Sequence, residues 1–77
     1  MLNFDEKVVF ITGGGGGIAE STAERFIERK AKVISTDITF QPRNFEDISF
    51  EENPVKIHLD VTDKDRVAEV IDLVEKN

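Results

Sequence analysis

The 77-residue sequence contains no cysteine, tryptophan or tyrosine, and only one histidine. The absence of cysteine rules out disulfides and thiolate metal sites and fits a cytoplasmic setting. No apolar run approaches the roughly 20 residues that a membrane-spanning helix needs. The first ten residues carry acidic groups ahead of their apolar run and no small-residue cleavage site, so we expect no secretory signal.

Basic residues are few. Ten Lys and Arg stand against sixteen Asp and Glu, which gives a net charge of −6, and the basic residues are scattered. Binding to nucleic acid or to an anionic lipid surface requires clustered basic side chains, so we exclude both as general partners. The length allows one small domain, residues 1–77, or a piece of a larger one.

The first half of the chain alternates strand and helix patterns. Residues 7–12 form a continuous apolar run, typical of a strand buried on both faces. From Ile18 to about Lys30 the apolar residues recur with helical spacing. A second strand is predicted over Lys32–Asp37.

The second half is less regular. Residues 39–54 follow neither period, and only a short helix over residues 44–49 is predicted there. Residues 55–61 alternate as an edge strand does, and Thr62 with Asp65 has capping-box spacing ahead of a final amphipathic helix. This β-α-β-(α)-β-α order predicts an α/β fold with a three-stranded parallel sheet, the first half of a doubly wound nucleotide-binding fold.

All five glycines stand together at residues 13–17, between the first strand and the first helix. Such a loop presents backbone N–H groups and the positive end of the helix dipole, which suits a phosphate. Because Gly17 is followed by Ile18 and Ala19, both the P-loop pattern and the strict G-x-G-x-x-G pattern fail. Thr-Gly-x-x-x-Gly-Ile does fit, and the glycines at 14–16 are expected to add mobility without ligand.

The stretch "TGGGGGIA", with its continuation "ESTAERFIERKAKVISTDI", resembles the TGxxxGIG signature of the short-chain dehydrogenase/reductase family. The resemblance implies a truncated Rossmann-type fold whose loop wraps a dinucleotide pyrophosphate. An acidic residue that ends the second strand would accept hydrogen bonds from the adenosine ribose. Asp37 holds that position, 20 residues after Gly17, and its charge favours NAD over NADP. "HLDVTD" is similar to the family's Asp-Val pair beside adenine. The implied cofactor-binding residues are Gly13, Gly16, Gly17, Ile18, Asp37, Ile38, Asp60 and Val61.

Two positions depart from the family pattern. Ala19 stands at its third glycine, and Lys30 stands where a helix-terminating glycine is common. The family's catalytic Ser, Tyr-x-x-x-Lys and Asn-Ala-Gly segments have no counterpart here, so no catalytic residue is assigned. No metal ligand is assigned either, and His58 is expected to be a surface residue.

Two functions therefore stay open. The chain could be the N-terminal, dinucleotide-binding part of an NAD(H)-dependent short-chain dehydrogenase, not catalytically competent alone. Alternatively, it could be a small, non-enzymatic Rossmann-like interaction module with a vestigial glycine loop. Each group of residues also has a purely structural interpretation: the glycines could form a plain flexible turn, Asp37 could cap a strand end, and Asp60 could begin a turn toward Thr62.

The topology has a consequence for both functions. The first strand lies in the middle of a complete doubly wound sheet, so its outer edge is expected to be exposed here. We expect that edge to pair with a second copy or with a missing C-terminal half, which predicts an oligomer.

Overall fold

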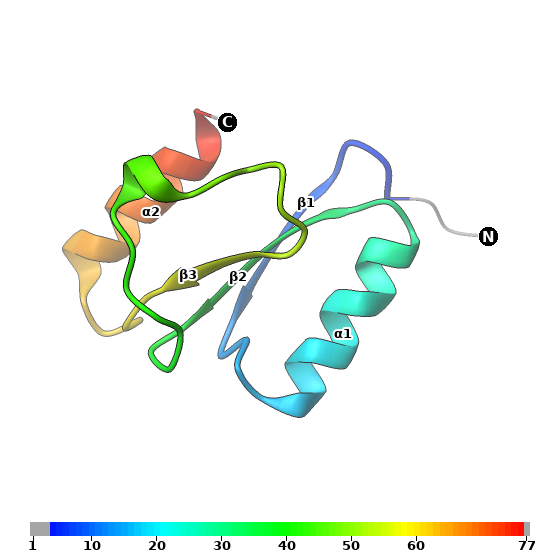
Figure 1. Ribbon diagram of the computed structural model, residues 1–77, viewed down its shortest axis with the longest axis horizontal. Coiled ribbons are helices and arrows are strands. Elements are labelled where there is room, and N and C mark those ends of the chain that lie inside the picture. Colours follow the sequence, from blue (N-terminus) through cyan, green and yellow to red (C-terminus); the bar gives the residue numbers. More distant parts are fainter. Residues whose placement is uncertain (1–3, 77) are drawn as a thin grey trace.

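A computed structural model describes residues 4–76. Its elements follow the predicted order, and the three strands form one parallel sheet in the order β1-β2-β3 (Figure 1). The elements are β1 Val8–Thr12, α1 Gly17–Glu28, β2 Lys32–Asp37, the 3₁₀ turn η1 Phe45–Asp47, β3 Val55–His58 and α2 Lys64–Glu75. The predicted α/β fold of Rossmann type, with a three-stranded parallel sheet, is confirmed.

The central strand β2 is covered on both faces. Its successive side chains point to opposite sides of the sheet, and each side packs against a different helix. Ile34 belongs to a buried cluster with Val70 of α2. Ser35 instead lies beside Ala23 of α1. The two helices thus lie on opposite sides of the sheet (Figure 1). The core cluster consists of Ile34, Val55, Ile57, Leu59 and Val70.

The first strand is less buried than its apolar sequence predicts. Val8 and Phe10 keep 58% and 38% of their surface exposed, whereas Val9 and Ile11 are half-buried. Val8 and Phe10 share a sheet face with Ile34, but the buried members of the cluster come from β2, β3, Leu59 and α2. The prediction that this strand is buried on both faces is therefore wrong for one face.

The irregular segment between β2 and β3 contributes to the core. A single 3₁₀ turn stands where a short helix was predicted, and Phe45, Ile48 and Phe50 pack against the buried cluster. Arg43 donates to the backbone carbonyl of Lys56 in β3 and forms an ion pair with Glu52 at 3.2 Å. This segment therefore covers the outer edge of β3, whereas β1 has a partner on one side only within residues 4–76.

The start of α2 differs from the predicted capping box. Asp63 is the N-cap residue, and its Oδ1 accepts the backbone N–H of Arg66 at 3.2 Å. The Thr62 hydroxyl instead donates to Asp60 Oδ1 at 2.7 Å, and the side chain of Asp63 caps the helix in its place. The strand before it is also shorter than predicted, because β3 ends at His58.

In the described part of the chain, neither helix has the length and apolar character required to cross a membrane.

Candidate functional site

The carboxyl ends of the three parallel strands meet at one edge of the sheet, and the segments that leave them carry the predicted binding residues. A cavity of about 170 Å³ lies at this edge. Its lining residues are Gly13, Asp37, Ile38, Leu59, Asp60 and Val61. Open α/β sheets bind their ligands in the crevice outside the carboxyl ends of their strands. Five of the eight predicted binding residues therefore border one cavity in the position expected for a ligand.

The loop after β1 is tied to the end of β2. Gly13 has a φ of 68°, in the left-handed region that favours glycine. Gly14 is buried, and its N–H donates to the Thr36 carbonyl at 2.8 Å. A Cβ on Gly14 would lie 1.8 Å from Ser35 Oγ, so a side chain here requires the neighbours to move.

Gly15 is held in a similar way. Its N–H donates to Asp37 Oδ2 at 2.7 Å, and a Cβ at this position would lie 2.6 Å from Thr39 Oγ1. Packing against β2 thus explains the glycines at 14 and 15, which the sequence indicated only as sources of mobility. Whether the loop is mobile without ligand stays a prediction.

The other predicted loop residues begin helix α1. Gly16 is the N-cap residue and makes no side-chain capping bond. Among residues 4–76, the N–H groups of Gly17, Ile18 and Ala19 have no hydrogen-bond partner, as expected for a first helical turn. A Cβ on Gly17 would meet no heavy atom within 4 Å. Ile18 is 88% exposed. Free donors and open space therefore coincide where an anion would bind.

Asp37 ends β2 and carries a fixed negative charge. Its Oδ1 accepts the backbone N–H and the hydroxyl of Thr39, at 2.9 and 3.0 Å. The Thr39 N–H, followed by the Gly15 N–H and the Thr39 hydroxyl, lowers the pKa of the Asp37 carboxyl. The carboxylate is therefore ionised at neutral pH, where it attracts hydroxyl donors and repels a phosphate.

Asp60 lies two residues after β3 and borders the same cavity as Asp37. Its Oδ1 accepts the Thr62 N–H and hydroxyl at 2.9 and 2.7 Å, and the hydroxyl is the largest cause that lowers the pKa of Asp60. At the same cavity, Ile38 and Val61 keep 58% and 57% of their surface exposed. Exposed aliphatic side chains beside ionised carboxylates suit a flat apolar ring with hydrogen-bond donors at its rim.

Sequence reasoning missed two parts of this site and misjudged one residue near it in the chain. Leu59 is buried and lines the cavity, and the alternation of β3 could have indicated this. Gly15 and Thr39 hold Asp37, and the spacing Asp-x-Thr was the available signal. His58, expected at the surface, is half-buried and donates from Nδ1 to the Phe40 carbonyl at 2.9 Å.

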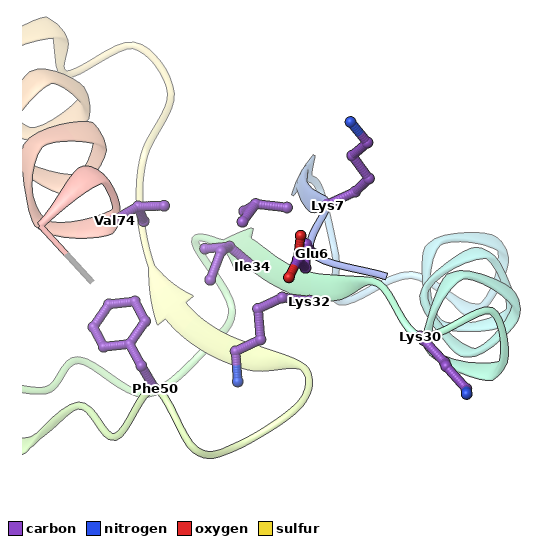
Figure 2. A pocket seen from close by; sticks show the side chains of 8 residues that line it. Glu6, Lys7, Lys30, Lys32, Ile34, Phe50 and Val74 are labelled. Carbon is purple, nitrogen blue, oxygen red and sulfur yellow. The ribbon is translucent and has the colours of Figure 1, made fainter. Parts of the chain in front are cut away.

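A larger cavity of about 270 Å³ lies toward the opposite ends of the strands, beside the uncovered face of β1. Figure 2 shows Val74 and Phe50 facing Ile34, while the ammonium groups of Lys7 and Lys30 point away from them. Lys32 donates to the backbone carbonyl of Glu52. The charged groups do not converge, so this cavity is an apolar gap between layers without recognisable chemistry.

Within residues 4–76, no three acidic or histidine side chains lie close enough together to hold a metal ion.

Comparison with known proteins gives the family. The family described as short chain dehydrogenase matches residues 7–77. The chain belongs to this family. The short-chain dehydrogenase match includes the glycine loop, both strand-end aspartates and both helices.

Individual relatives agree with this assignment. The chain is 30% identical to an NAD-dependent glycerol dehydrogenase of Listeria innocua, over 97% of this chain and 30% of the relative. It is 37% identical to secoisolariciresinol dehydrogenase of Forsythia intermedia, over 86% of this chain and 24% of the relative. A 37-residue stretch is 51% identical to peroxisomal multifunctional enzyme A of Dictyostelium discoideum. The chain thus spans less than a third of the length of these curated relatives.

Proposed function

We propose that residues 1–77 form the dinucleotide-binding part of a cytoplasmic, NAD(H)-dependent short-chain dehydrogenase. The free N–H groups at the start of α1 would take the pyrophosphate, and Asp37 would take the ribose hydroxyls of the adenosine half. The base would lie between Ile38 and Val61, with Asp60 at its rim. Because this sequence contains no tyrosine, the family's Tyr-x-x-x-Lys pair would have to come from outside it, and the segment alone would bind without catalysing.

The position of Asp37 carries this proposal. Its carboxylate is ionised, and it is held between the glycine loop and the cavity by Gly15 and Thr39. An additional phosphate on the ribose would face this charge, which is the reason to propose NAD(H) rather than NADP(H). The open space at Gly17 supports the same proposal, because no packing within residues 4–76 requires a glycine there.

A fluorescence titration with NADH tests the proposal, since the chain contains no tryptophan or tyrosine to interfere. We expect NADH to bind the unmodified chain, NADPH to bind more weakly, and Asp37→Ala to weaken NADH binding by about tenfold or more, because charge-assisted hydrogen bonds are lost. Asp72→Ala, which removes an exposed carboxylate from α2, is the matched control and should bind as the unmodified chain does.

The result that contradicts the proposal is a chain that folds but binds no NADH at any accessible concentration. That result would favour the alternative, a non-enzymatic interaction module with a vestigial loop. One observation already gives the alternative some weight, namely the exposed apolar face of β1.

We further propose that the outer edge of β1 pairs with another strand, from a second copy or from chain beyond this segment. The backbone carbonyl of Lys7 accepts the Lys32 N–H. Because backbone groups of successive residues in a strand point to opposite sides, the N–H and C=O groups of Val8 and Phe10 point away from β2. An unpaired strand edge with apolar side chains favours association.

A further inference from the structure

The same three-residue arrangement occurs at the ends of two neighbouring strands. Residues 37–39 read Asp-Ile-Thr from the last residue of β2, and residues 60–62 read Asp-Val-Thr shortly after β3. In both, one carboxylate oxygen, Oδ1, accepts the N–H and the hydroxyl of the threonine two residues later, at 2.7–3.0 Å. Both aspartates border the same cavity, and each intervening aliphatic side chain is more than half exposed.

This arrangement leaves the second oxygen of each carboxylate as the acceptor with spare capacity. An ionised carboxylate has about four lone-pair positions, two on each oxygen, so two donors fill Oδ1. Asp37 Oδ2 accepts one N–H, from Gly15, and has one position left. Asp60 Oδ2 has no hydrogen-bond partner within residues 4–76.

The threonine hydroxyls have no other evident task. Helix α2 is capped by Asp63, so the Thr62 hydroxyl is not needed to begin the helix. Thr39 lies in an exposed turn that starts no helix. Each hydroxyl does add a second bond to an oxygen that already accepts a backbone N–H. That second bond opposes rotation of the carboxylate, whose terminal torsion angle otherwise has a broad distribution.

We propose that Thr39 and Thr62 are positioning residues of the dinucleotide site, each orienting one carboxylate so that Oδ2 is presented to the ligand. Thr39 acts through Asp37 on the ribose hydroxyls, and Thr62 acts through Asp60 on the amino group of the base. The inference rests on the proposed function. It adds that two threonines outside the family's signature loop separately set the affinity for the sugar and for the base.

The two roles are separable with three ligands, measured by titration calorimetry. The probes are adenosine monophosphate, its dideoxy analogue without ribose hydroxyls, and inosine monophosphate, whose base carries an oxygen in place of the amino group. Thr39→Val should weaken the binding of adenosine monophosphate by about threefold to tenfold, which is the usual effect of one lost hydrogen bond. It should leave the affinity for the dideoxy analogue unchanged.

Thr62→Val should show the complementary pattern. It should weaken the binding of adenosine monophosphate by a similar factor. It should leave the affinity for inosine monophosphate unchanged, because the base of that ligand has no amino group to donate to Asp60. Thr39→Ser and Thr62→Ser keep the hydroxyl and should restore binding. Ser49→Ala is the control, because Ser49 lies in the segment between β2 and β3, where its hydroxyl accepts the backbone N–H of Glu51. It should change none of the three affinities.

Carboxyl NMR provides a readout that needs no ligand. The Thr39 hydroxyl helps to lower the pKa of Asp37, so Thr39→Val should raise that pKa toward its ordinary value and leave Asp60 unaffected. Thr62→Val should raise the pKa of Asp60 alone. If a folded valine variant leaves the pKa of its own aspartate unchanged, the carboxylate is not held by that hydroxyl and the inference is wrong.

The outcomes separate the two proposals. If the unmodified chain binds none of the three ligands, the proposed function fails and the inference fails with it. If the chain binds adenosine monophosphate but the valine variants weaken all three ligands equally, or none of them, the function stands and the positioning roles are overturned.

Discussion

At the scale of single residues, Lys30 shows how the end of a helix is formed by a residue that is poorly suited to it. Its φ is 70°, in the left-handed region. Its N–H donates to the Ile27 carbonyl at 2.9 Å, and the N–H of Ala31 donates to the Phe26 carbonyl at 3.0 Å. These two bonds form a Schellman motif, in which glycine is the preferred residue at the position of Lys30.

Lys30→Gly should therefore stabilise the fold. The left-handed conformation costs a lysine roughly 1–2 kcal/mol, and the greater freedom of glycine in the unfolded chain offsets part of the gain. We expect the free energy of unfolding to rise by about 0.5–1 kcal/mol, measured by urea denaturation. Glu24→Gly in the middle of α1 is the control and should lower it by about 1 kcal/mol. A decrease for Lys30→Gly would contradict this explanation of the helix end.

At the scale of elements, the glycine loop and the start of α1 use their glycines for different reasons. At Gly14 a side chain would collide with Ser35, so the loop could not lie as closely on β2. At Gly17 a side chain would meet nothing in the described chain. Packing explains the first glycine, and an approaching ligand is the proposed explanation of the second.

Substituting alanine at Gly14 and at Gly17 should thus change the free energy of unfolding in opposite directions. Gly14→Ala should lower the free energy of unfolding by about 1–3 kcal/mol, as overpacked sites do, and Ser35→Ala in the same chain should restore part of the loss. Gly17→Ala should raise it by about 0.5 kcal/mol, yet weaken NADH binding. Thermal unfolding and NADH titration of each variant check both statements. Unchanged NADH affinity in Gly17→Ala would show that no ligand uses the open space.

At the scale of the whole molecule, the sheet is protected at one edge and bare at the other. Arg43 and the segment around it cover β3, while β1 exposes Val8 and Phe10 and has no second partner within residues 4–76. A sheet with one covered edge pairs most readily through the other.

We expect the isolated chain to be an oligomer at micromolar concentration, as measured by sedimentation. Val8→Lys should shift it toward monomer, because a charged lysine on an edge strand disfavours pairing. Ser21→Lys adds the same charge on exposed α1 and should leave the oligomer intact. A clean monomer of the unmodified chain would refute the prediction.

Much of this fold could be predicted because its signals are local. Lys32–Asp37 was predicted to the residue, since it follows the first helix after a short link, as αβ connections usually do. The start of α2 was misplaced by one residue, because the Thr62 hydroxyl bonds to Asp60 instead of capping the helix. The strand before α2 was predicted too long, because alternation continues through Val61 after the chain has left the sheet. Both errors fall on the candidate site, where side chains bond to their own turns.

The sequence by itself determined the order of elements, the parallel sheet and the spacing that marks the short-chain dehydrogenase family. Hydrophobic periodicity and turn residues are patterns of a few neighbouring positions, so they can be recognised in the sequence alone. Only the tertiary structure decided that Gly15 bonds to Asp37, 22 residues away, and that Val8 and Phe10 are exposed. Those features depend on which distant segments meet, and in a parallel sheet the ends of successive strands meet only after each crossover has packed.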